Sequence, residues 1–372
     1  MFRLTARRYV ENVAGVYISY PFCAQKCTYC NFASGVLPRE LEARYIDALR
    51  AELLATEWPW TPETIYLGGG TPSQMDASAL ESLLDEIPGR QWREATIEAA
   101  PGTITKEKAA LWRRAGIGRV SLGVQSFITR ELSRTGRRHT AETVAADVAM
   151  LRAAGIGSIN IDLIAGIPGQ TYASWNESLD WLERIGAPHA SVYMLEVDDD
   201  SRLGHEILLR GKRYGASDVP GDDAIADFYE RAVDRLPRMG LDRYEISNFS
   251  RPGFESRHNL KYWRREPYLG FGADAHSFSG VWRWSNAESA ADYVDGAAAP
   301  NRTMADAIGE RFFLGLRLAE GIEGDWSPFE EPIEKFLREG LLESDGRRLR
   351  LTSRGVMVSN EVFAEFVCEP VG

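Results

Sequence analysis

Three of the four cysteines in this 372-residue chain fall within one short stretch, YPFCAQKCTYCNF. Cys23, Cys27 and Cys30 form a C-x3-C-x2-C motif, and thiolates this close together can bind one metal centre. A structural zinc site has four ligands, and a [4Fe–4S] cluster held by protein alone has four cysteines. Three cysteines leave one position open. The motif therefore indicates an iron–sulfur cluster with one iron free for a small ligand that carries an amine and a carboxylate.

Two other interpretations of the cysteines stay open at this point. One of the five histidines could complete a Cys3His zinc site, or the three thiols could be free. Structural zinc sites usually pair two such motifs, and the sequence has no second pair. The fourth cysteine, Cys368, follows EVFAEFV near the C-terminus, and we expect it to be a partly buried free thiol.

Polar residues also occur where strands are predicted to end. The cysteine loop follows the first predicted strand and GGGTP (68–72) follows the second. The later strands carry Glu98, Gln125, Asp162 and Tyr193. In a barrel all these strand ends meet at one mouth, whereas an open sheet concentrates its site at one switch point. A barrel is therefore the favoured arrangement.

The elements that must position these residues alternate between short β-branched runs and amphipathic helical patterns. This alternation from residue 14 to about 250 is typical of parallel βα units. The fold class predicted is α/β, a partial (β/α)6 TIM-like barrel. The predicted strands cover residues 15–20, 64–69, 95–100, 119–124, 158–164 and 190–195.

Three regions are predicted along the chain. Residues 1–250 form the barrel, and residues 251–304 form a connecting segment rich in aromatic residues, glycine and histidine. Residues 305–372 read as two helices, a hairpin that turns at SDGR and a last helix, which is typical of a winged-helix-like domain.

Composition excludes several classes of partner. A net charge of -11 argues against nucleic acid bound by bulk electrostatics. The sequence has no signal peptide and no apolar run of about 18 residues that could span a membrane. We therefore expect a cytoplasmic protein with reduced cysteines.

The sequence CAQKCTYC at the end of the first strand of such a barrel resembles the radical S-adenosylmethionine (SAM) superfamily. This resemblance implies a [4Fe–4S] cluster whose open iron binds the methionyl group of SAM, and it places Tyr29 near the adenine. Further motifs, among them PFC, GGGTP, GVQSF and IDLIAGIPGQT, are similar to the family of oxygen-independent coproporphyrinogen III oxidases and their relatives. By this resemblance the SAM-binding residues are Tyr17, Tyr29, Gly69, Gly70, Thr71, Glu98, Gln125, Arg137 and Asp162.

Two departures favour the HemW branch of that family, which is proposed to bind heme and pass it to acceptor proteins. The oxidases have a further cysteine two residues after the third, where this chain has Phe32, and they have a longer N-terminal extension. HemW-type proteins also have an H-N-x-x-Y-W motif, which HNLKYW (258–263) fits. An imidazole can ligate heme iron and aromatic rings can stack on a porphyrin. The heme-binding candidates are His258, Tyr262, Trp263 and His276.

The resemblance therefore implies a heme-binding and heme-transfer protein with a SAM-coordinated cluster, whose partners are heme and heme-acceptor proteins. The alternatives are an oxygen-independent coproporphyrinogen III dehydrogenase, which would decarboxylate propionates, and a radical SAM methyltransferase or heme-opening enzyme on the same scaffold. If SAM is cleaved, an electron donor such as flavodoxin or ferredoxin is implied. Peripheral membrane association through the acceptors is a further expectation.

Overall fold

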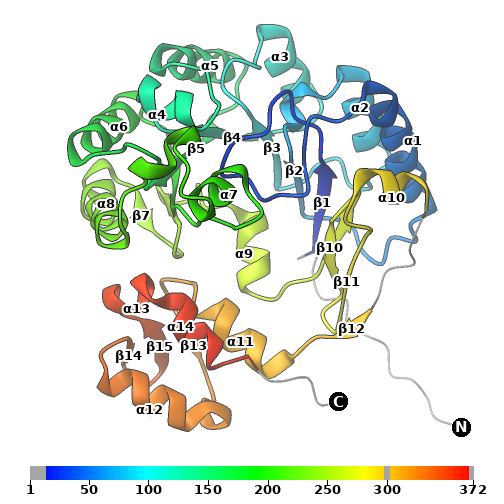
Figure 1. Cartoon of the computed structure of the whole chain (residues 1–372). Coiled ribbons are helices and arrows are strands. Elements are labelled where there is room, and N and C mark those ends of the chain that lie inside the picture. The colour runs from blue at the N-terminus through cyan, green and yellow to red at the C-terminus, as the bar shows by residue number, and fades with distance from the viewer. Residues whose placement is uncertain (1–13, 297–301, 368–372) are drawn as a thin grey trace, which may run out of the picture.

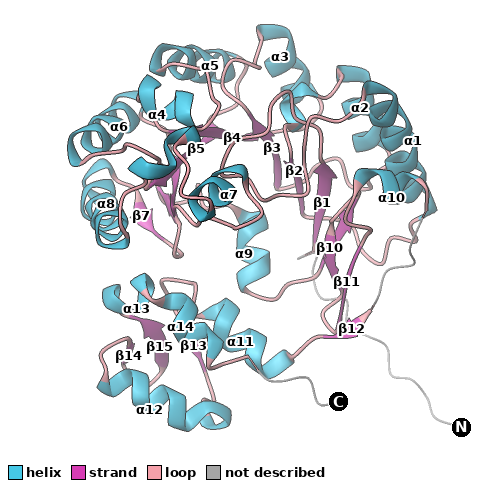
Figure 2. Ribbon diagram, viewed as in Figure 1, coloured by secondary structure: helices cyan, strands magenta, loops and turns pink. Residues whose placement is uncertain are grey.

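The computed structural model describes residues 14–296 and 302–367. Cys368 lies outside these residues. A parallel sheet of six strands curves around a central space, and helices cover its outer side (Figures 1 and 2). The strands follow one another in the sheet in chain order, and they are β1 (Gly15–Tyr20), β2 (Thr64–Gly69), β3 (Glu94–Ala99), β4 (Arg119–Gln125), β5 (Ser158–Ala165) and β6 (His189–Met194).

The period of two along each strand separates the apolar face of the sheet from its polar face. Val16 and Ile18 of β1 and Leu67 of β2 are fully buried under the outer helices. The alternate positions carry polar side chains that face the inside of the barrel. The six strands lie within about two residues of their predicted positions, so the predicted α/β barrel is confirmed.

The outer helices α2, α3, α5, α6 and α7 begin after residues whose side chains accept hydrogen bonds from free backbone N–H groups. Thr140 and Thr171 each form a capping box with the residue three positions later, and Gly186 ends α6 in the left-handed conformation. The helices of this part are α1 (Arg39–Ala55), α2 (Ala77–Asp85), α3 (Lys106–Arg114), α4 (Thr129–Arg134), α5 (Ala141–Ala153), α6 (Tyr172–Ile185), α7 (Arg202–Leu208) and α8 (Asp222–Arg235), with short 3-10 turns η1 (Pro72–Gln74), η2 (Arg213–Asp218) and η3 (Leu236–Met239).

Residues 251–304 do more than connect two parts of the chain, because several strands from this region extend the sheet. β9 pairs with β1 in parallel, and on the other side β8 pairs with β6 in the antiparallel sense. The barrel is therefore open between β1 and β6, and α9 joins the two added strands across that side (Figure 1). The elements of residues 251–304 are α9 (Arg257–Trp263), β9 (Tyr268–Phe271), β10 (His276–Phe278), β11 (Trp282–Ser285), α10 (Ala290–Val294) and β12 (Thr303–Met304), and β7 (Asp242–Arg243) and β8 (Asn248–Ser250) precede them.

The C-terminal part has its own three-stranded sheet, in the order β13-β15-β14. Phe312, Phe336 and Phe366 pack at its centre. The order of helix, helix, hairpin and helix agrees with the predicted C-terminal domain, while the predicted domain boundaries stay a prediction. The elements are α11 (Ala307–Gly315), β13 (Ile322–Glu323), η4 (Ser327–Phe329), α12 (Glu330–Arg338), β14 (Leu342–Ser344), β15 (Arg348–Leu351), α13 (Ser353–Met357) and α14 (Ser359–Ala364). Across the described residues, every helix is too short or too polar to cross a bilayer.

Candidate functional site

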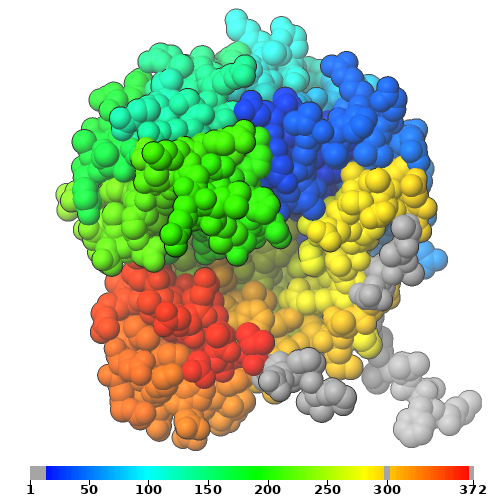
Figure 3. Space-filling view, in the orientation of Figure 1, coloured from blue at the N-terminus to red at the C-terminus, as the bar shows by residue number. Residues whose placement is uncertain are grey.

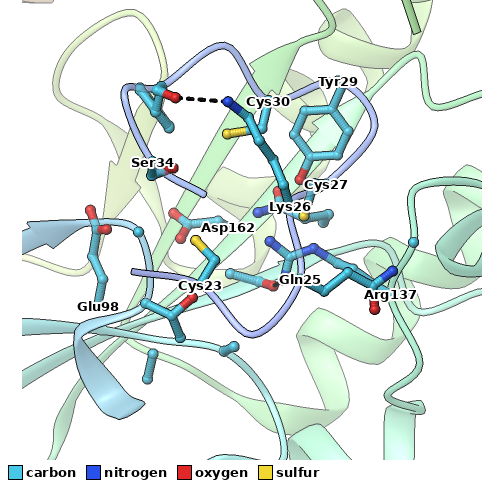
Figure 4. Close-up of a pocket in the computed structure, with 18 of the residues that line it drawn as sticks. Cys23, Gln25, Lys26, Cys27, Tyr29, Cys30, Ser34, Glu98, Arg137 and Asp162 are labelled. Carbon is cyan, nitrogen blue, oxygen red and sulfur yellow. Dashed lines mark hydrogen bonds between the residues drawn. The ribbon is translucent and has the colours of Figure 1, made fainter. Parts of the chain in front are cut away.

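The cysteine loop lies at the mouth of the barrel, between β1 and α1. Cys23, Cys27 and Cys30 are half-buried free thiols that line one cavity of about 690 Å³ (Figure 4). Backbone hydrogen bonds position the loop from both sides. The Thr28 N–H donates to the carbonyl of Thr135 at 3.2 Å, and the Thr28 carbonyl accepts from the N–H of Leu203 at 2.8 Å. Side chains from β2, β3, β4, β5 and β6 line the same cavity. The structure thus brings together the strand ends that the sequence predicted to meet.

The glycine segment after β2 packs directly against the start of the cysteine loop. The N–H of Gly70 donates to the carbonyl of Tyr20 at 2.7 Å, and the N–H of Thr71 donates to the carbonyl of Phe22 at 2.9 Å. Gly69 has a φ of +105°, which side chains rarely adopt. This segment therefore fixes the distance between two loops that line the cavity, and the amides of Gly70 and Thr71 already have protein partners.

Gly70→Ala is expected to distort the site. A Cβ at this position would lie 2.7 Å from the Phe22 carbonyl oxygen and 2.9 Å from the Pro21 carbonyl carbon, both backbone atoms. The cysteine loop must then move, and we expect SAM binding to the protein with its cluster reconstituted to weaken at least about tenfold, the effect of misplacing one or two hydrogen bonds to a charged ligand. Anaerobic equilibrium dialysis with labelled SAM measures this. Gly157→Ala is the control, because a Cβ there meets nothing within 4 Å. Equal affinity in both variants would contradict the expectation.

Glu98 is the acidic group that β3 contributes to the cavity. Its Oε1 accepts a hydrogen bond from the Tyr66 hydroxyl at 2.9 Å. Burial raises the pKa of Glu98 to about 7, with the nearby Asp162 adding to the shift. The Tyr17 ring stacks on the Tyr66 ring, with 6.1 Å between the centroids, but Tyr17 is not among the residues that line the cavity. Glu98 is therefore a carboxyl group that can exchange a proton near neutral pH.

Asp162 on β5 has partners from its own strand and from the neighbouring strand β4. Its Oδ1 accepts from Asn160 Nδ2 at 2.7 Å, and its Oδ2 accepts from the Ser121 hydroxyl at 3.1 Å. His189 binds Asn160 Oδ1 through Nδ1 at 2.6 Å. Burial raises the pKa of Asp162. These contacts satisfy the acid inside the barrel, as a buried carboxylate requires.

Gln125 and Arg137 form no hydrogen bond or ion pair with Glu98 or Asp162 among the described residues. Gln125 ends β4 with a φ of +70°, at a register shift that begins after Leu122. Arg137 lines the same cavity and donates to the Gly123 carbonyl, with Tyr29 and Cys27 beside it. Gln125 Oε1 and Arg137 Nε are buried without a hydrogen-bond partner in the described part of the chain. Two orphaned polar atoms in a cavity lined by three thiols fit a polar cofactor such as SAM.

The heme-binding candidates lie outside this cavity. His258 is fully buried at the end of the barrel where β1 and β2 begin, with Nδ1 2.9 Å from Thr64 Oγ1 and Nε2 2.8 Å from the Tyr262 hydroxyl. Both ring nitrogens are therefore engaged in this structure. Trp263 is half-buried, and His276 is exposed at the start of β10. Their role in heme binding stays a prediction.

The sequence interpretation missed Tyr66, Ser121 and Asn160, which are the partners of the two acids. Each occupies an inward-facing position on its strand, on the same face of the sheet as Glu98 and Asp162. Reading every second residue of the predicted strands, and not only the charged ones, would have found them.

Comparison with known proteins identifies two matching family models. The radical SAM superfamily matches residues 17–182, and the HemN C-terminal domain matches residues 303–358. Together they cover most of β1, all of β2 to β5 and most of the C-terminal part, while β6 lies between the two matches.

Curated relatives match along almost the whole chain. The heme chaperone HemW of Lactococcus lactis is 34% identical over 95% of this chain and 97% of its own length. HemW of Bacillus subtilis is 32% identical over 95% and 99%, and HemW of Mycobacterium tuberculosis is 36% identical over 94% and 93%. Among solved structures, coproporphyrinogen III oxidase (HemN) from Escherichia coli has a TM-score of 0.81 over 96% of this chain and 91% of its own, at 21% identity. That likeness shows the shared fold.

Proposed function

This chain belongs to the HemW family of heme chaperones, and from this premise we propose that it binds heme and transfers it to acceptor proteins. The observation that carries the proposal is the match to heme chaperones over about 95% of the chain, which includes the cysteine loop, α9 and the C-terminal part. Phe32 supports the same proposal, because the oxidases of the family have a further cysteine at this position. The residue is 66% exposed beside the cysteine loop.

The barrel carries a [4Fe–4S] cluster and SAM as cofactors. Cys23, Cys27 and Cys30 would hold the cluster, which would offer SAM an open iron position and a source of an electron. Gln125 Oε1 and Arg137 Nε, which have no partner among the described residues, would hydrogen-bond such a ligand. Glu98, with a pKa of about 7, can accept a hydrogen bond in its charged form or donate one in its neutral form.

The partners follow from this function. Heme is the cargo, and heme-acceptor proteins receive it. If SAM is cleaved, we propose that a small electron-transfer protein such as flavodoxin or ferredoxin reduces the cluster. Membrane association through membrane-bound acceptors and a cytoplasmic location likewise remain proposals.

A hemin titration tests the function. We expect the full chain to shift the Soret band away from that of free hemin and to saturate near one heme per chain. Thiolates can themselves ligate heme iron, so Cys23→Ala serves as a control, and we expect it to bind hemin as the wild type does. The variants His258→Ala and His276→Ala then show which imidazole ligates the iron. A wild-type protein that leaves the Soret band of hemin unchanged would refute the proposed function.

A further inference from the structure

Arg317 lies on the open side of the barrel, between two aromatic rings from different parts of the chain. Its guanidinium carbon is 4.4 Å from the centroid of Trp263 on α9 and 5.7 Å from that of Phe363 on α14. The backbone around it is fixed to the barrel, because Leu318 forms a bridge with Glu245 and the Ala319 N–H donates to the Tyr244 carbonyl at 3.0 Å. Arg317 is therefore held by both parts of the molecule.

The charge of Arg317 has no counter-ion at contact distance. None of the salt bridges and side-chain hydrogen bonds formed among the described residues includes Arg317, and its Nε is buried without a partner. The carboxyl of Glu245 is also buried; burial raises its pKa, while a hydrogen bond from Asn248 and the charge of Arg317 lower it. The indole Nε1 of Trp263 is also buried without a partner. Two orphaned donors thus lie side by side, and a guanidinium stacked on a ring keeps its in-plane N–H groups free.

Burial lowers the pKa of the Arg317 guanidinium, and the charges of Glu245, Glu196 and Tyr193 counteract that shift. Tyr193 and Glu196 also line the cavity that contains the three thiols. In the space-filling view a hollow separates the green α7 region from the red C-terminal helices, and the yellow-green α9 segment lies deep within it (Figure 3). A ligand in this hollow would approach α9, whose last residue is Trp263, without entering the barrel.

We infer that Arg317 and Trp263 recognise a propionate carboxylate of the heme cargo, an inference that rests on the proposed function. A carboxylate accepts two parallel hydrogen bonds from a guanidinium, and it can take a further one from the indole N–H. Heme combines such carboxylates with a flat apolar ring, and the Tyr262 ring packs beside Trp263, with 6.4 Å between the ring centroids. Arg317 would thus determine specificity for porphyrins with free propionates.

The test compares hemin with hemin dimethyl ester, whose propionates are uncharged, in the same detergent. We expect the wild type to bind hemin about tenfold to a hundredfold more tightly than the ester, the range for losing hydrogen bonds to a charged group. Arg317→Met should weaken hemin binding by a similar factor and leave binding of the ester nearly unchanged. Arg317→Lys keeps the positive charge but loses the planar guanidinium. Its affinity for hemin should lie between those of the wild type and Arg317→Met. The matched control is Arg302→Met, because Arg302 also stacks on a tryptophan, Trp284, at 4.7 Å, but on an exposed part of the surface.

Each outcome decides the inference. Equal affinity of the wild type for hemin and its ester would overturn it, and so would an equal loss for both ligands in Arg317→Met. The wild-type comparison needs no variant, so it decides the matter even if Arg317→Met does not fold. A wild type that binds neither ligand would instead refute the proposed function, and this inference with it.

Discussion

Replacing Cys23 with alanine is expected to abolish the iron–sulfur cluster. The three thiols line one cavity from a single loop, and a [4Fe–4S] cluster with one open iron has no other protein ligand to replace a missing thiolate. Two cysteines would leave two irons without protein ligands. Cys23 is half-buried on a loop, so its loss should change the free energy of unfolding by about 1 kcal/mol or less.

Iron and sulfide analysis of anaerobically reconstituted protein measures the effect. We expect about four irons per wild-type chain and close to none in Cys23→Ala, with loss of the cluster absorption in the visible range. The matched control is Cys368→Ala, which removes the cysteine outside the loop and should keep the full iron content. Retention of the cluster in Cys23→Ala would refute the assignment of the three cysteines.

His258→Ala is expected to destabilise the protein by about 3 kcal/mol at pH 7.5, because it removes a buried ring and leaves two hydroxyl groups without their partner. His258 hydrogen-bonds Thr64 and Tyr262, and its ring stacks on Tyr66. Because the Tyr66 hydroxyl donates a hydrogen bond to Glu98, the loss of His258 also disturbs that contact. Chemical denaturation of the wild type and the variant measures the difference in the free energy of unfolding. His205→Ala is the control, because His205 is exposed on α7.

The destabilisation should also depend on pH. Burial lowers the pKa of His258 to about 3, with Lys261 adding to the shift, whereas the unfolded chain binds the proton near pH 6.5. The unfolded state therefore binds more protons between these values, and the contribution of His258 to stability is complete above pH 6.5 and decreases as the pH falls. Below pH 6.5 the difference in the free energy of unfolding between wild type and variant should fall by about 1.4 kcal/mol per pH unit. At pH 5 it should therefore be smaller by about 2 kcal/mol. A gap that stays constant with pH would mean that His258 titrates normally in the folded protein.

The features that the sequence predicted well depend on local patterns. The six barrel strands were predicted from β-branched runs with a period of two. Strands that are consecutive in the chain and joined by one helix are usually neighbours in a parallel sheet, which explains their order. The ends of such strands share one edge of the sheet. Cys23, Gly70, Glu98 and Asp162 were therefore expected to meet, and they line one cavity.

Features that depend on contacts between distant segments were predicted less well. Residues 251–304 read as a connection because their strands are short, and only pairing with the exposed edge of β1 makes them part of the sheet. Gln125 was predicted to lie on a regular strand, but β4 shifts its register before this residue and gives it a positive φ, and its Oε1 has no hydrogen-bond partner among the described residues. A strand pattern contains no information on such a shift.

The sequence by itself determined the chemistry of the cysteine loop, the barrel and the membership of the HemW family, because residue types, spacing and periodicity are local properties of the chain. Only the tertiary structure decided what surrounds each of these residues. His258 lies 194 residues from Thr64 along the chain, yet the two side chains share a hydrogen bond. Arg317 becomes a candidate for carboxylate recognition only because α9, α11 and α14 meet around it, and burial and unsatisfied hydrogen bonds arise from such packing.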